Sequence, residues 1–88
     1  MKLIIAIVRD IDNDSISNAL TSSSFKVTCI ASTGGLLRRG NSTLLIGLEN
    51  DKVENALEII KSKTSSDSQD DKHHGVIFVL DVDEYIQI

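Results

Sequence analysis

Short apolar runs alternate with helical hydrophobic patterns along this chain. Four of the runs are rich in Ile and Val and are bounded by polar residues, as is typical of strands: Leu3–Val8, Phe25–Ser32, Ser42–Leu48 and Gly75–Val82. Ser15–Ser22 and Asp51–Lys63 carry apolar residues at helical spacing and predict helices. The resulting order, β-α-β-β-α-β, predicts an α+β ferredoxin-like sandwich, with two helices on one face of a four-stranded sheet.

Polar residues are expected to fix the ends of the helices, and alternation is expected to divide the second strand into two faces. The segment 10–13 offers N-cap side chains for the first helix, and Asp51 with Glu54 resembles a capping box at the second. One face of the second strand is expected to hold Phe25, Val27, Cys29 and Ala31. This pattern predicts that the cysteine is a small buried packing residue.

Both faces of the predicted sheet are apolar. In the first strand Leu3, Ile5 and Ile7 point to one face, while Ile4, Ala6 and Val8 point to the other. Two short helices can cover only one of these faces. The simplest partner for the second face is another copy of the chain, so the pattern predicts a homo-oligomer whose sheets face inward.

Length and charge narrow the class of protein. The 88 residues suffice for a single domain, residues 1–88, in which the polar segment Thr64–His74 is expected to form a flexible loop. The net charge of −4 argues against a nucleic-acid binder. The single cysteine indicates a reducing compartment, and the first apolar run is too short for a signal sequence or a membrane span. We therefore expect a cytoplasmic protein.

No set of residues resembles a catalytic centre. The sequence has no Ser-His-Asp arrangement with a recognisable elbow, no metal-ligand spacing of Cys and His, and no P-loop. The adjacent His73 and His74 lie in the polar segment, where solvated side chains are the usual outcome. The chain is therefore expected to be no enzyme and to hold neither a metal nor a cofactor.

The segment Thr33–Asn41 has the densest local pattern, with three glycines and the adjacent pair Arg38 and Arg39. It can be a solvated hairpin whose glycines only supply φ > 0. It can also help to bind an anion, since Arg9 and Lys26 flank it in the predicted sheet and glycine leaves backbone N–H groups accessible. The neutral donors for such a site are Thr28, Ser32, Thr33 and Asn41.

Three stretches carry a resemblance to a known family. They are the opening Met1–Val8, the stretch Phe25–Thr43 with its Thr-Gly-Gly…Arg-x-Gly-Asn core, and the ending Gly75–Asp83 with Tyr85 and Gln87 after it. On these motifs the chain resembles the PII-like cyclic-di-AMP receptors (PstA-type) of Gram-positive bacteria. The resemblance spans nearly the whole chain, although the loop before the last strand is shorter here than in the family.

The resemblance implies a PII-like homotrimer with a role in signal transduction. Cyclic-di-AMP, or a related adenine nucleotide, would bind in clefts between subunits, and the signal would pass to an unidentified downstream protein. Carried over position by position, the ligand-binding residues would be Thr28, Leu36, Leu37, Asn41, Gly47 and Gln87, with Lys26 near the phosphates.

Several positions depart from the family pattern. Ser24, Lys26 and Val27 stand where the family usually has Asn, Arg and Ala, and Leu36 replaces an aromatic residue. Lysine keeps the positive charge but lacks the guanidinium fork, and leucine lacks a face on which a base can stack. The alternative hypothesis is therefore a PII-like trimer that has lost cyclic-di-AMP binding and acts as an interaction scaffold or senses another small ligand.

Overall fold

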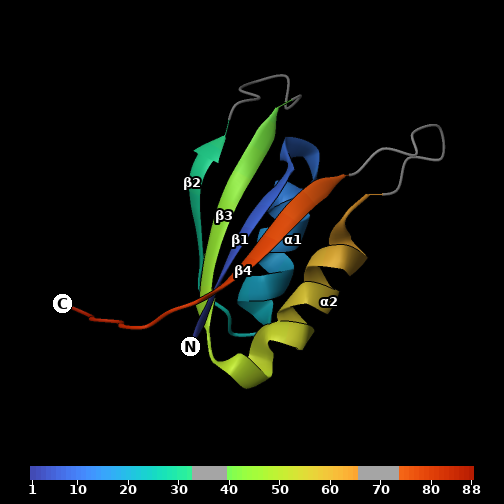
Figure 1. The fold of residues 1–88 in the computed structure, drawn as a ribbon. Helices are drawn as coiled ribbons and strands as arrows, with labels where there is room; N and C mark the ends of the chain where they lie inside the picture. Colours follow the sequence, from blue (N-terminus) through green and yellow to red (C-terminus); the bar gives the residue numbers. More distant parts are fainter. Residues whose placement is uncertain (33–39, 66–73) are drawn as a thin grey trace.

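The computed structural model describes residues 1–32, 40–65 and 74–88. Along the chain it contains strand β1 (Lys2–Arg9), helix α1 (Asp10–Ser22), strands β2 (Val27–Ser32) and β3 (Asn41–Leu48), a 3-10 turn η2 (Asn50–Lys52), helix α2 (Val53–Lys63) and strand β4 (Gly75–Asp81). This order is the predicted ferredoxin-like one (Figure 1). The expectation of a flexible loop concerns mainly residues 66–73, which lie outside the described residues.

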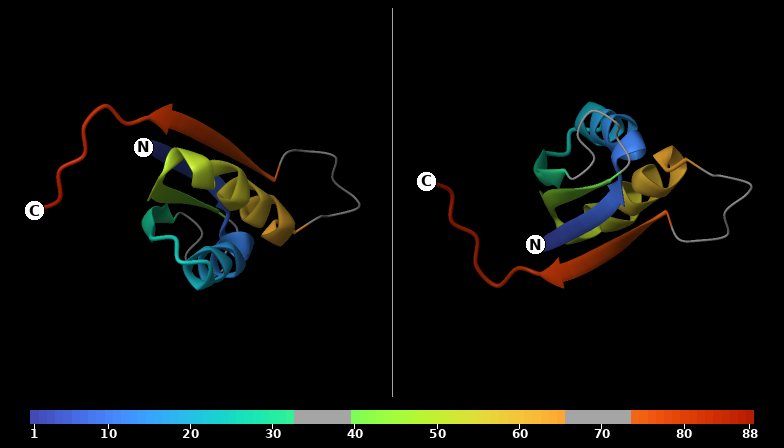
Figure 2. Two further views of the ribbon diagram at one scale, coloured as in Figure 1. Left: turned by 90° about the horizontal axis from the view of Figure 1, so that it is seen from below. Right: turned by 90° about the horizontal axis from the view of Figure 1, so that it is seen from above.

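The four strands form one antiparallel sheet in the order β2-β3-β1-β4. β1 is central and pairs along its whole length with β3, from Lys2 opposite Leu48 to Arg9 opposite Asn41. On its other side β1 pairs with β4, where Ile5 lies opposite Phe78. Both helices lie on the same side of the sheet, as Figures 1 and 2 show, so the sheet has one covered face and one open face.

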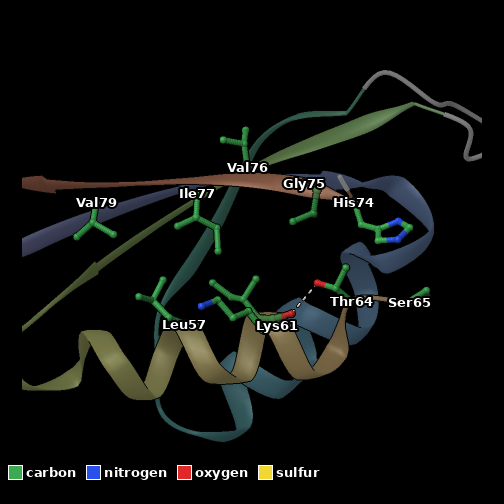
Figure 3. A pocket seen from close by; sticks show the side chains of 11 residues that line it. Leu57, Lys61, Thr64, Ser65, His74, Gly75, Val76, Ile77 and Val79 are labelled. Atoms are coloured by element: carbon green, nitrogen blue, oxygen red, sulfur yellow. Dashed lines mark hydrogen bonds between the residues drawn. The ribbon is translucent and has the colours of Figure 1, made fainter. Parts of the chain in front are cut away.

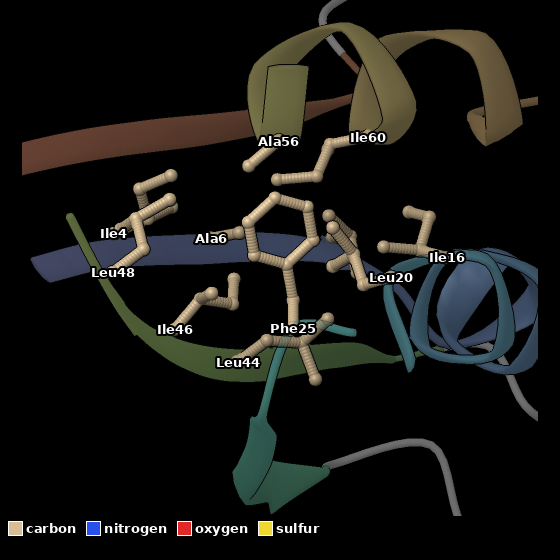
Figure 4. Close-up of a cluster of buried hydrophobic side chains, with 11 residues drawn as sticks. Ile4, Ala6, Ile16, Leu20, Phe25, Leu44, Ile46, Leu48, Ala56 and Ile60 are labelled. Atoms are coloured by element: carbon tan, nitrogen blue, oxygen red, sulfur yellow. The ribbon is translucent and has the colours of Figure 1, made fainter. Parts of the chain in front are cut away.

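The hydrophobic core lies between the covered face and the helices. Its members come from the sheet, the two helices and the start of the segment after α1, and are almost fully buried: Ile4, Ala6, Val8, Ile16, Leu20, Phe25, Leu44, Ile46, Leu48, Ala56 and Ile60. Most of these side chains are labelled in Figure 4, where the ring of Phe25 lies among aliphatic groups from the strands and both helices. Alternate residues of β1 and β3 supply one row each, because successive side chains of a strand point to opposite faces.

The ends of the helices differ from the expectation. α1 begins at Asp10, five residues earlier than predicted, with Arg9 as N-cap and no side-chain cap hydrogen bond. The expected capping box is also wrong, because neither η2 nor α2 has a side-chain cap hydrogen bond. The acidic residues at the start of α1 instead bond to other elements, a use that local sequence patterns do not reveal.

Strand β2 does not keep the predicted alternation. Its register shifts between Cys29, which lies opposite Leu44, and Ala31, which lies opposite Thr43. Leu44 is buried and Thr43 is on the other face, so the irregularity moves Ala31 to the open face. Cys29 is exposed, and its expected role as a buried packing residue is wrong. The strand lies at the edge of the sheet, where the helices do not cover this position.

The open face is apolar, as the sequence predicted. Val76, Phe78 and Leu80 of β4 are 45, 51 and 43% exposed and lie opposite Ile7, Ile5 and Leu3 of β1. The segment after β4 runs away from the rest of the chain in Figures 1 and 2, and its Tyr85, Ile86 and Ile88 are exposed. Among the described residues, nothing covers these apolar side chains.

Candidate ligand-binding site

A helix-ending motif shapes one end of the sheet. The N–H of Phe25 donates to the carbonyl oxygen of Leu20 at 3.0 Å, and the N–H of Ser24 donates to that of Thr21 at 3.0 Å. With Ser24 at φ 70° between them, these bonds form a Schellman motif in which serine occupies the left-handed position that favours glycine. The motif directs Phe25 into the core and lets the exposed Lys26 follow at the surface.

A hollow of about 390 Å³ opens beside this motif. It brings together the end of α1, the start of β2, the end of β3 and the C-terminal segment; its lining includes Ser24, Lys26, Gly47, Lys52 and Tyr85. The ammonium groups of Lys26 and Lys52 and the exposed ring of Tyr85 therefore border the same space, together with the carboxylate of Glu49. Such a lining can hold a phosphate group beside a planar base, because lysine attracts the anion and tyrosine offers a face for stacking.

Gly47 lines the hollow and leaves space in it, because glycine has no side chain. A Cβ atom added to this residue would meet nothing within 4 Å. The fold therefore does not require glycine here for packing, in contrast to Gly75, whose added Cβ would come within 2.7 Å of the carbonyl oxygen of Ile7. A glycine within a strand often marks a bulge or the close approach of another group. No bulge is present at Gly47, because the register of β3 against β1 is continuous there. The remaining interpretation is the close approach of another group.

The other predicted ligand residues lie at different places. Thr28 is exposed on the open face, opposite Leu45 and two strand positions from the hollow. Asn41 is at the far end of β3, six residues and about 20 Å from Gly47. Gln87 is exposed in the C-terminal segment. Leu36 and Leu37 lie outside the described residues. Within one subunit the structure thus brings together Lys26 and Gly47, with Thr28 beside them.

Arg9 does not join Lys26 in a single cationic cluster. Its Nε lies 3.3 Å from the Asp12 carboxylate, and its Nη2 donates to the carbonyl oxygen of Ser65 at 2.8 Å. It also lies opposite Asn41, at the end of the sheet remote from Lys26. The anion site expected from Arg9 and Lys26 together is therefore wrong for these two residues, while Arg38 and Arg39 lie outside the described residues.

The bonds around Asp12 form a polar network that sequence reasoning missed. The Asp12 carboxylate is 1% exposed and accepts hydrogen bonds from the backbone N–H of Ser65, at 3.0 Å, and from the Ser65 hydroxyl. The buried Asp10 carboxylate accepts from the hydroxyl of the buried Ser42. Ser42 is 32 positions from Asp10, and Ser65 is 53 positions from Asp12, so no local sequence pattern indicates these hydrogen bonds. They fix the ends of α1, β3 and α2 to one another.

Comparisons with known proteins agree with this architecture. A family model described as "Cyclic-di-AMP receptor" matches residues 1–72. A crystal structure of a functionally unknown protein from Pediococcus pentosaceus is similar over 99% of this chain and 96% of that one, with 33% sequence identity and a TM-score of 0.78. Among the described residues, no helix has the length and hydropathy needed to cross a membrane.

The family match covers most of the chain, including β1, β2, β3 and the residues that border the hollow from those strands. The matched family consists of receptors and not of enzymes, in agreement with the expectation from the sequence. The chain belongs to the cyclic-di-AMP receptor family.

Proposed function

We propose that this chain is a PII-like signal-transduction protein that binds cyclic-di-AMP, or a related adenine nucleotide, in clefts between the subunits of a cytoplasmic homotrimer. Ligand binding would then change the surface that an unidentified downstream protein recognises. The observation that carries the proposal is the hollow in which Lys26, Gly47 and Tyr85 meet, in a chain of this family.

The chemistry of the hollow fits such a ligand. A cyclic dinucleotide combines phosphodiester groups with flat bases, and the hollow offers two lysines and one tyrosine. The space in front of Gly47 admits a ligand group close to the backbone of β3, because no side chain fills it. These features support the proposed roles of Lys26 and Gly47 from within one subunit.

The open face supports the proposed assembly. Its exposed Val76, Phe78 and Leu80 continue the apolar surface of β1, and contact with further copies would remove that surface from water. Asn41 lies about 20 Å from Gly47 within one chain, so a ligand that contacts both positions needs two subunits. The same requirement applies to Gln87 if it reaches a neighbouring subunit from the extended C-terminal segment.

The test is Gly47→Val, measured by titration calorimetry with cyclic-di-AMP. The fold has room for this side chain, and valine is favoured in strands, so the variant should keep its melting temperature. A ligand that approaches the β3 backbone would collide with the added side chain, and the affinity should fall at least about tenfold, or 1.4 kcal/mol. Thr43→Val, on the same strand and face but away from the hollow, is the control.

The outcomes separate the two hypotheses. Loss of binding in Gly47→Val with normal binding in Thr43→Val would support a nucleotide site at the hollow. Binding of cyclic-di-AMP that Gly47→Val leaves unchanged would overturn the site. No heat and no change of melting temperature with the unmodified protein would instead favour the alternative, a trimer that has lost this ligand and acts as a scaffold or senses another small molecule.

A further inference from the structure

A second and larger cavity lies on the covered side of the sheet, between α2 and β4. It has a volume of about 690 Å³, within the range of about 300–1,000 Å³ of pockets that hold small ligands. In Figure 3 Ile77 and Val79 point toward α2, and Leu57 points toward β4. The buried side chains of Val8 and Ile60 also line it. The cavity shares no lining residue with the hollow at Gly47.

The cavity exists because the helices cover β4 less completely than β1. Val79 and Ile4 lie opposite each other on the covered face, yet Val79 is 43% exposed and Ile4 is fully buried. The wall that β4 contributes is therefore apolar and partly accessible, a surface that gains stability when an apolar group covers it. This feature belongs to the covered side of the sheet, so the assembly proposed for the open face does not account for it.

The polar lining residues do not form one cluster. Thr64, Ser65 and His74 lie near the end of α2 and the start of β4, whereas Figure 3 shows the Lys61 nitrogen beside Leu57. The hydroxyls of Thr64 and Ser65 already donate to Ile60 and Asp12, so they are occupied. The Lys61 ammonium has no ion-pair partner within residues 1–32, 40–65 and 74–88. An apolar wall with one available cation suits a molecule that is apolar along its length and anionic at one end.

We propose that the α2–β4 cavity binds a monocarboxylate with a linear acyl chain. The carboxylate would lie at the Lys61 ammonium, which Figure 3 shows beside Leu57. The chain would lie along Leu57, Ile77 and Val79. The proposal is independent of the nucleotide site, because the two sites share no lining residue.

The test follows backbone amide shifts in two-dimensional NMR during titration with octanoate and decanoate below their micelle concentrations. Saturable shifts should concentrate on residues 57–65 and 74–79. Each additional buried methylene should tighten binding about fourfold, so decanoate, with two more methylenes, should bind about sixteenfold more tightly than octanoate. Octylammonium, which has the same length and the opposite charge, should bind more weakly than octanoate.

Two variants separate the apolar contribution to binding from the contribution of the Lys61 charge. Lys61→Met keeps the aliphatic stem and removes the charge, so octanoate should bind about threefold more weakly while neutral 1-octanol is unaffected. Val79→Thr introduces a hydroxyl in a similar volume and should weaken both compounds. Lys63→Met is the matched control, because Lys63 is on the same helix and does not line the cavity.

Several results would overturn the proposal. One is the absence of saturable shifts; another is equal binding of octanoate and octylammonium. Shifts that concentrate on the open-face residues Leu3, Ile5 and Leu45 would place the acyl chain on the wrong side of the sheet. The unliganded spectrum of each variant shows whether it is folded, so loss of binding through misfolding is recognised separately.

Discussion

The two faces of the sheet are nearly equal in hydrophobicity and very different in burial. On the covered face Ile4, Ala6, Leu44 and Ile46 are fully buried against the helices. On the open face Phe78 of β4 is 51% exposed, although it is as apolar as any of them. The difference teaches that folding of a single chain buries one apolar face of the sheet and leaves the other accessible. The covered face makes the chain fold, and the open face is available for contact between copies.

The largest effect is expected from Ile46→Ala on the covered face. Removing three carbon atoms from a fully buried site should cost about 2–5 kcal/mol of unfolding free energy, because the cavity left behind closes only partly. Urea denaturation followed by circular dichroism measures this loss. It should not depend on protein concentration, since the site is buried within one chain.

Leu45→Ala, one residue away on the open face, is the matched comparison. Leu45 is half-buried in the single chain, so its loss should act mainly through association and should diminish as the protein is diluted. The proposed difference between the two faces would be refuted if Ile46→Ala and Leu45→Ala lost the same free energy of unfolding at every protein concentration.

A second effect is expected from Phe78→Lys, which places a charge on the open face at β4. We expect the assembly to dissociate to single chains at micromolar concentration, because truncating or charging a buried aromatic contact costs about 2 kcal/mol or more. Sedimentation equilibrium measures the mass. Ile11→Lys is the control, since Ile11 is 54% exposed on α1 and should leave the mass unchanged. An unmodified protein that sediments as a single chain would refute the role of the open face.

The smallest effect is expected at the polar margin of the covered face. A hydrogen bond and the positive charge from Lys2 lower the pKa of Asp81 below its ordinary value of 3.8. The folded state therefore holds this proton less tightly than the unfolded state. The contribution to stability is present above pH 3.8 and is lost as the pH falls through the pKa of the folded state.

Asp81→Asn should remove that acidic dependence. The difference in melting temperature between the variant and the unmodified protein should be small at pH 7 and should vanish as the pH falls below the pKa of Asp81 in the folded state. It should also diminish at high salt, because the pair is exposed. A difference that grows with acidity would contradict the sign of the shift.

The sequence predicted the fold where hydrophobic periodicity acts alone. The strands and the second helix carry clear patterns, and each was found within a few residues of its observed bounds. The errors occur at residues whose hydrogen bonds or packing involve residues distant in the sequence. Asp10 and Asp12 were expected to cap α1, but their partners Ser42 and Ser65 come from other elements. The exposure of Cys29 follows from its place on an uncovered edge strand, and the move of Ala31 to the open face follows from an irregular register; alternation reveals neither.

The candidate site was predicted through family resemblance more than through local chemistry. Lys26 and Gly47 are 21 positions apart, and only the pairing of β2 with β3 places both beside one hollow. Tyr85 and Lys52 border the same hollow and were not among the predicted ligand residues. For Tyr85 the weak signal in the sequence was a lone tyrosine after the last strand, and for Lys52 there was no signal. The predicted assignments of Thr28, Asn41 and Gln87 remain proposals.

The network around Asp12 has a consequence for protein engineering. Ser65 is held to α1 by two hydrogen bonds, and Gly75 is held in the sheet opposite Val8, so the chain is anchored on both sides of residues 66–73. Closing a longer connection between fixed ends costs only about 0.6 kcal/mol for each doubling of its length. A peptide tag or a reporter domain inserted between these two anchors should therefore cost little unfolding free energy, because Ser65 and Gly75 keep their own contacts.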